Sequence, residues 1–153
     1  MNSASIKKVS NGQASGQELD VQPERRLGFS GYIASRAIDG NRIPQHIQNL
    51  VVREYAKKHQ LAFNLSATEY NCQSCYLLLE QLLNQIDQID GIILYSLFML
   101  PEKYERRKMI YQKIIETGKA LHAAVEDYQI ASWDDVDRIE SVFRLNNMIK
   151  YCP

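Results

Sequence analysis

The sequence predicts an α/β fold in which a parallel sheet of about four strands lies between helices on both faces, giving three layers. Segments with a strand-like pattern alternate four times with segments whose apolar residues follow helical spacing. Residues 91–95 are almost entirely apolar, as a strand buried on both faces of a parallel sheet should be. Polar residues gather directly after each expected strand. Right-handed crossovers would connect the strands.

The length and composition favour a single domain preceded by a tail. The 153 residues suit one folded unit, which we expect to span 28–153. Apolar residues make up 45% and charged residues 24%, the ordinary balance of a globular protein. Residues 1–27 are rich in small polar side chains, and their few apolar residues follow no period. Such a segment buries too little surface to offset its ordering entropy, so we expect a flexible tail.

Charge, apolar runs and cysteine content exclude several classes. The 18 basic and 18 acidic residues give zero net charge, whereas a generic nucleic-acid-binding protein carries a basic excess. The longest apolar stretch, 92–100, is half of the roughly 18 residues that a membrane span needs, and no signal peptide is recognisable. Three cysteines fit a reduced compartment. We expect a cytoplasmic protein without a membrane or nucleic-acid partner, and a homo-oligomer stays open.

The first half of the chain predicts two strands and two helices. Residues 29–34 form a short strand signal, followed by a turn cluster at 39–41. Pro44 then occupies the first position of a helix, where its missing N–H costs nothing. Residues 61–65 are a second strand candidate. The helical apolar positions are Ile47, Leu50, Val51 and Tyr55 in the first helix, and Leu78, Leu79, Leu82, Leu83 and Ile86 in the second.

The second half predicts two further strands and helices. After the strand at 91–95, residues 104–115 have helical spacing, and Gly118 ends that helix. Residues 120–125 are the fourth strand. Ser132 and Asp135 have the spacing of a capping box, with Asp in the place usually taken by Glu. The last helix carries its apolar face on Val136, Ile139, Phe143 and Met148.

The carboxyl ends of the expected strands define the candidate site, because ligands of such sheets bind there. Arginine offers a planar fork for phosphate or carboxylate, and a helix starting at Pro44 turns its free N–H groups to the same edge. Ordinary polar loops would contain similar residues, and that alternative stays open. The ligand-binding candidates are Arg36, Asn41, Arg42, Gln45, Ser66, Tyr70 and Ser96, and the catalytic candidates are Ser35, Glu69 and Glu126.

Other motifs give no cofactor or metal site. Cys72 and Cys75 form an isolated C-x-x-C, which is a weak redox signal, and no further pair completes a zinc site. His122 lies among apolar residues and is expected to pack in the core or at its rim. The charged run 103–108 suits the solvated start of a helix, from which Arg106 or Arg107 could reach the ligand edge. We expect neither a cofactor nor a metal.

Two strings resemble the start of the serine recombinase (resolvase) catalytic domain, namely 31–36 (GYIASR) and 44–48 (PQHIQ). The order of elements is also similar over residues 29–145, which implies a resolvase-like, flavodoxin-like sheet. The family's serine nucleophile aligns with Arg36 instead. Phe98, Met99 and Glu102 stand where the family has charged residues that hold the scissile phosphate. The resemblance therefore implies a shared fold without DNA cleavage.

A closer resemblance is to the sporadic carbohydrate cluster proteins. It rests on residues 31–36 (GYIASR), 40–50 (GNRIPQHIQNL), 65–70 (LSATEY) and 95–101 (YSLFMLP). The resemblance covers most of residues 30–140. It implies a bacterial protein associated with surface-polysaccharide biosynthesis genes.

These observations lead to one main functional hypothesis and two alternatives. The main hypothesis is a binder of, or enzyme for, a phosphorylated or nucleotide-linked sugar. In it, Arg36 and Arg42 hold the anion, the serines donate hydrogen bonds, and Glu69 or Glu126 transfers a proton. The first alternative is a non-catalytic partner protein of a glycan-synthesis complex. The second is a degenerate recombinase that still binds DNA, which the zero net charge disfavours.

Overall fold

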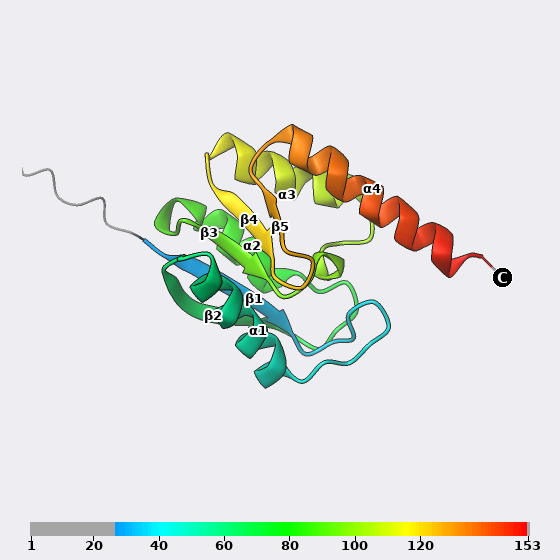
Figure 1. The fold of residues 1–153 in the computed structure, drawn as a ribbon, viewed down its shortest axis with the longest axis horizontal. Helices are drawn as coiled ribbons and strands as arrows, with labels where there is room; N and C mark the ends of the chain where they lie inside the picture. Colours follow the sequence, from blue (N-terminus) through cyan, green and yellow to red (C-terminus); the bar gives the residue numbers. More distant parts are fainter. Residues whose placement is uncertain (1–26, 153) are drawn as a thin grey trace, which may run out of the picture.

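The computed structural model describes residues 27–152 as an α/β structure built on one five-stranded sheet (Figure 1). The expected tail, residues 1–27, lies outside the described residues apart from Leu27. The sheet has the order β2-β1-β3-β4-β5, in which the first four strands are parallel and the last is antiparallel. The strands are β1 (Phe29–Ala34), β2 (Phe63–Glu69), β3 (Gly91–Leu94), β4 (Ala120–Ala123) and β5 (Tyr128–Ile130). The α/β class and the parallel pairing are confirmed.

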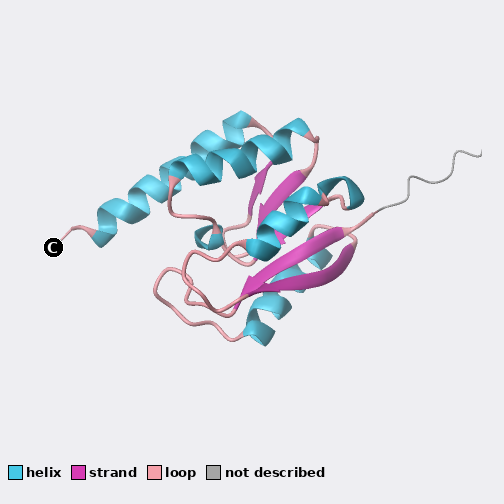
Figure 2. Cartoon of the chain, turned by 180° about the vertical axis from the view of Figure 1, so that it is seen from behind, coloured by secondary structure: helices cyan, strands magenta, loops and turns pink. Residues whose placement is uncertain are grey.

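Helices cover both faces of the sheet, unequally. Tyr32 and Ile33 are neighbours in β1, so their side chains point to opposite faces and mark two separate cores. Ile33 packs under α1 alone, whereas Tyr32 belongs to a larger core with α2, α3 and α4 (Figures 1 and 2). The helices are α1 (Gln45–Lys58), α2 (Leu77–Asn84), α3 (Tyr104–Glu116) and α4 (Trp133–Lys150), with short 3₁₀ turns η1 (Ile86–Gln88) and η2 (Leu97–Met99).

Two predicted helix ends are confirmed by their local geometry, and a third is displaced by one residue. Pro44, predicted as the first residue of the helix, is instead the residue before α1, and its carbonyl accepts hydrogen bonds from the N–H groups of Ile47 and Gln48. Gly118 follows α3 with a positive φ of 67°, a conformation that favours glycine. Ser132 and Asp135 form the expected reciprocal capping box at the start of α4. Each of these signals is local, and each fixes where a helix begins or ends.

The predicted bounds of the second strand, 61–65, are wrong, because Gln60 and Leu61 form the turn that ends α1. Gln60 takes a left-handed conformation, and the N–H of Leu61 bonds back to the carbonyl of Ala56, closing the helix in a Schellman motif. β2 therefore starts at Phe63 and runs to Glu69. Ser66 consequently lies in the middle of the strand instead of after its end.

The predicted bounds of the fourth strand, 120–125, are also wrong, and one strand is missing from the prediction. β4 ends at Ala123, so Val125 lies in the connection, although its N–H still bonds to the Tyr95 carbonyl. Asp127, with a φ of 55°, turns the chain back into the antiparallel β5. Only one of the three β5 residues is buried, which leaves no apolar pattern to detect. The sheet therefore has five strands instead of about four.

None of the helices within residues 27–152 combines the length and apolar content needed to cross a membrane.

Candidate functional site

A cleft of about 650 Å³ opens at the carboxyl ends of the parallel strands. The loops after β1, β2 and β3 form it, together with the start of α3 and the end of α4. Figure 2 shows the long loops gathered beyond the arrowheads of the strands. The charged residues that line the cleft are four cations, Arg36, Lys103, Arg106 and Lys150, and two acids, Asp39 and Glu102. The cleft lining therefore has a formal excess of positive charge.

Arg36 joins the three loops of the cleft. It leaves the end of β1, and its Nη1 donates to the Cys75 carbonyl at 3.0 Å while its Nη2 donates to the Met99 carbonyl at 3.2 Å. Its guanidinium also lies 4.7 Å from the centre of the Tyr76 ring. These contacts use only two of its five N–H donors, so Arg36 keeps donors for a ligand.

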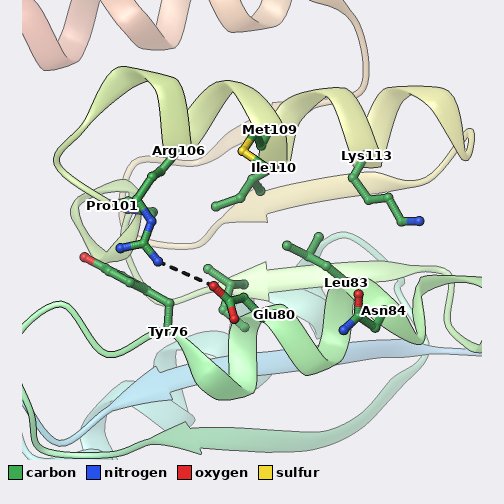
Figure 3. Close-up of a pocket in the computed structure, with 10 residues that line it drawn as sticks. Tyr76, Glu80, Leu83, Asn84, Pro101, Arg106, Met109, Ile110 and Lys113 are labelled. Carbon is green, nitrogen blue, oxygen red and sulfur yellow. Dashed lines mark hydrogen bonds and ion pairs between the residues drawn. The ribbon is translucent and has the colours of Figure 1, made fainter.

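Arg106 reaches the same aromatic ring from α3. Its guanidinium lies 4.9 Å from the Tyr76 ring centre, and its Nη2 pairs with the Glu80 carboxylate at 3.4 Å (Figure 3). Burial raises the pKa of Tyr76, so the ring carries no charge near neutral pH. Two guanidiniums thus meet at one ring, from elements 70 residues apart in the chain. An anion between them would relieve their mutual repulsion.

The far wall of the cleft is tied together by Lys150 and Asp39. Lys150, the last residue of α4, forms an ion pair with Asp39 in the loop after β1, and Asn146 donates to the same carboxylate at 3.3 Å. The hydrogen bond from Lys150 is the largest cause that lowers the pKa of Asp39. The charges of this pair offset each other locally, so the net positive charge of the cleft lies on its Arg36, Lys103 and Arg106 side.

Glu69, a predicted catalytic residue, caps α2 from inside the core. It is 0% exposed, and its carboxylate accepts from the Tyr32 hydroxyl at 2.9 Å and from the N–H groups of Leu78 and Leu79 at 3.0 and 3.3 Å. The second oxygen accepts from the N–H of Tyr70 at 3.3 Å. A carboxylate at a helix N-terminus is favourable, and this one has its acceptors occupied. Its geometry fixes the position of α2.

Glu126 and Ser96 play a similar part at the turn after β3. The Ser96 hydroxyl donates to Glu126 at 2.6 Å, and the Leu97 N–H donates to the second carboxylate oxygen at 3.0 Å. Ser96 Oγ also accepts from the Phe98 N–H at 3.2 Å. Neither residue lines the cleft. They hold the η2 turn, whose Met99 carbonyl in turn holds Arg36.

Ser35, Arg42 and Gln45 lie together, but apart from the cleft. They line a separate hollow of about 280 Å³ that shares no lining residue with the cleft. Gln45 Nε2 donates to the Ser35 hydroxyl at 2.6 Å. Arg42 is exposed and forms no hydrogen bond or ion pair with residues 27–152. The expected convergence of Arg36 and Arg42 on one anion is therefore wrong, because the loop after β1 carries them into different cavities.

Three remaining candidates lie outside the cleft lining. Ser66 packs beside Gly31 in mid-strand and donates to Asn49 of α1 at 2.7 Å, because β2 starts two residues later than expected. Asn41 is exposed and donates to the Asp39 carbonyl at 3.2 Å. Tyr70 is exposed beyond the end of β2. Of these three, Asn41 alone forms a hydrogen bond with a residue of the cleft lining among the described residues.

Gln48 and Tyr76 are not among the site residues predicted from the sequence, and Arg106 is predicted only as an alternative to Arg107. Gln48 is fully buried and holds the end of β1, donating to the carbonyls of Ala34 and Ile43 and accepting from the Ala34 N–H. For Arg106 a usable signal existed, since the helix after a central parallel strand starts at the ligand edge. For Tyr76 no motif marks the ring, and its role depends on where two distant arginines meet.

Arg107, the neighbour of Arg106, points into the protein. Its guanidinium forms two hydrogen bonds with Glu140 at 2.8 and 2.7 Å and donates to the carbonyls of Pro101 and Glu102. Burial opposes ionisation of Glu140, but the hydrogen bonds from Arg107 and Tyr111 lower its pKa overall. Arg107 therefore anchors the segment before α3, and this segment supports the cleft.

His122 is packed in the core, as predicted. It is 5% exposed, and its Nδ1 lies 2.8 Å from the Tyr55 hydroxyl. Burial lowers the pKa of His122 to about 4. Cys72 and Cys75 are free thiols beside the cleft. No group of three or more His, Cys, Asp or Glu side chains in the described part of the chain is placed to hold a metal ion.

Comparisons with family models, with curated proteins and with solved structures find no match to this chain.

Proposed function

We propose that this protein binds a phosphorylated sugar, free or nucleotide-linked, in the cleft at the carboxyl ends of its strands. The observation that carries the proposal is the pair of guanidiniums, Arg36 and Arg106, on the Tyr76 ring. Lys103 and Lys150 line the same cleft. A phosphate has the negative charge and the pairs of acceptor oxygens that a guanidinium binds with two parallel hydrogen bonds.

We propose that the cleft binds its ligand and that neither Glu69 nor Glu126 transfers a proton to it. Both of these carboxylates already accept hydrogen bonds from backbone N–H groups. Among the acids that line the cleft, Asp39 is paired with Lys150, whereas Glu102 is exposed. If the bound sugar phosphate is turned over, Glu102 is the carboxylate with access to it.

The biological setting is proposed from the resemblance alone. The strings GYIASR and GNRIPQHIQNL support membership of the carbohydrate cluster family, and with it a cytoplasmic role in bacterial surface-polysaccharide synthesis. The three-layer, resolvase-like form of the fold belongs to the same proposal. We do not extend it to DNA cleavage, because Phe98, Met99 and Glu102 provide no cations for a scissile phosphate.

A second candidate function is a non-catalytic partner protein of a glycan-synthesis complex. Large apolar side chains are exposed along the last turns of α4, at Leu145 and Ile149, and directly after the helix, at Tyr151. Figure 1 shows this end of α4 extending beyond the sheet. Exposed apolar residues that gather in one place favour a protein contact.

The test is a thermal shift panel of sugar phosphates, nucleotide sugars and oligonucleotides. A ligand at 100 times its Kd adds about 2.7 kcal/mol of stability, which is readily measured. The best ligand is then titrated by calorimetry into wild type, Arg106→Ala and the control Arg53→Ala, an exposed arginine on α1. We expect roughly 10- to 150-fold weaker binding for Arg106→Ala and no change for Arg53→Ala. A panel without any hit would favour the partner-protein function.

A further inference from the structure

A groove of about 300 Å³ lies between α2 and α3, and Figure 3 shows the residues that line it. Tyr76, Pro101 and Arg106 line both this groove and the cleft. The two cavities therefore adjoin at these three residues.

The chemistry of the groove differs from that of the cleft. Its floor is aliphatic, formed by the buried side chains of Leu79, Leu83 and Ile110. Met109 forms one wall and is 71% exposed. Of the polar side chains, Arg106 stands at the end that adjoins the cleft, Glu80 lies nearer the middle, and Asn84 and Lys113 stand at the far end (Figure 3).

We infer that the groove binds an aliphatic chain joined to the phosphate that the cleft holds. The ligand class is then an amphiphilic phosphate ester, with its anion against Arg36 and Arg106 and its chain along α2 and α3. This inference rests on the proposed function, since the cleft must bind the phosphate. Two features of the site carry it, namely the three lining residues that the two cavities share and the match of each cavity to one half of such a ligand.

An aliphatic chain fits the lining of the groove better than a nucleobase does. A base needs hydrogen-bonding partners along its edge, and the floor of the groove offers only the aliphatic side chains of Leu79, Leu83 and Ile110. The one aromatic ring in the lining, Tyr76, already contacts two guanidiniums. Leu83 and Ile110 offer dispersion contacts to an aliphatic chain. Burial of their apolar surface by such a chain would also stabilise the complex.

The Arg106–Glu80 ion pair spans the junction of the two cavities (Figure 3). Both side chains are partly exposed, and ion pairs of this kind contribute little to stability. A phosphate can therefore replace Glu80 as the partner of Arg106 at low cost. Its chain would then start at the cleft end of the groove.

The test compares methyl phosphate with octyl phosphate, below the concentration at which the latter forms micelles. Calorimetry on the full chain measures both. Burial of three methylenes alone corresponds to roughly 50-fold in affinity, so we expect octyl phosphate to bind at least about 10-fold more tightly than methyl phosphate. Met109→Glu should remove this advantage while leaving methyl phosphate binding in place. Met109→Ala should reduce the advantage in part.

The matched control is Leu50→Glu, a change on α1 at a residue that is 56% exposed and lines neither cavity. It should leave the octyl advantage intact. Equal affinity for the two phosphates would overturn the chain subsite and leave the proposed cleft standing. An octyl advantage that persists in Met109→Glu would place the chain elsewhere and also overturn the inference. Failure of both phosphates to bind would instead remove the proposed function, and the inference with it.

Discussion

The hydroxyl of Tyr32 donates a 2.9 Å hydrogen bond to the carboxylate of Glu69 inside the core. Tyr32 belongs to β1, and Glu69 ends the neighbouring strand β2 while capping α2. One buried pair therefore joins two strands and a helix. Burial raises the pKa of the Tyr32 phenol well above its usual range, so the hydroxyl stays a donor.

This arrangement predicts that Glu69 contributes to the free energy of unfolding, without a role in catalysis. Glu69→Gln removes the charge that the α2 N–H groups and Tyr32 solvate, and should lower the free energy of unfolding by about 2 kcal/mol. Tyr32→Phe removes one hydrogen bond and should cost about 1 kcal/mol. Urea denaturation of both variants measures these losses. Unchanged stability of Glu69→Gln, with loss of a measured activity, would restore the catalytic role expected from the sequence.

A pair of arginine variants can show whether the ligand binds in the cleft or in the separate hollow lined by Arg42. Arg106→Lys should keep part of the phosphate affinity, because the ammonium retains charge but loses the fork, whereas Arg42→Ala should leave affinity unchanged. Arg42 lines only the separate hollow with Ser35 and Gln45. Calorimetry with the best phosphate ligand gives both values. A large loss in Arg42→Ala alone would move the site to that hollow.

Removing the competing carboxylate should strengthen binding. Glu80 pairs with Arg106 at 3.4 Å, so Glu80→Gln leaves the guanidinium free for a ligand phosphate. We expect roughly 2- to 5-fold tighter binding, the scale of an exposed ion pair, and little change in stability. Glu54→Gln, an exposed position on α1, serves as control. Weaker binding in Glu80→Gln would show that Glu80 itself contacts the ligand.

The buried His122 should make stability depend on pH between about 4 and 6.5. Its pKa is about 4 in the folded protein and near 6.5 when unfolded, so in this window the unfolded chain binds more protons. Stability is then fully present above pH 6.5 and falls as the pH drops toward 4, by up to about 3 kcal/mol. Urea denaturation at pH 7 and pH 5 measures the slope. His122→Gln should flatten it, and an equal slope in this variant would assign the effect to other groups.

How far the sequence predicts this structure depends on how local each signal is. The capping box at Ser132 and the stop at Gly118 are read from a few adjacent residues, and both are confirmed. The start of β2 depends on whether Leu61 closes α1 or opens a strand, and only the packed structure decides that. β5 has a single buried residue and carries no pattern.

The candidate site is harder to predict than the fold for a related reason. The rule that ligands bind at the carboxyl ends of strands correctly selects the edge where the cleft opens. It does not separate Arg106 from Arg107, since the phase of α3 sends one into the cleft and the other to Glu140. The same rule does not show that the Glu69 carboxylate is occupied by hydrogen bonds from the start of α2. That helix begins eight residues after Glu69 in the chain.

Because Asp39 contacts the end of α4, this wall of the cleft can form only late in the synthesis of the chain. Asp39 and Asn146 are 107 residues apart in the chain, so the cleft wall joins one of the earliest described loops to the last helix. Closing such a long separation is entropically costly and slow. During synthesis the first strand and its loop emerge well before α4, and a wall of the cleft is absent until that helix docks. The complete lining of the cleft, with Lys150, would thus exist only in chains in which α4 has docked.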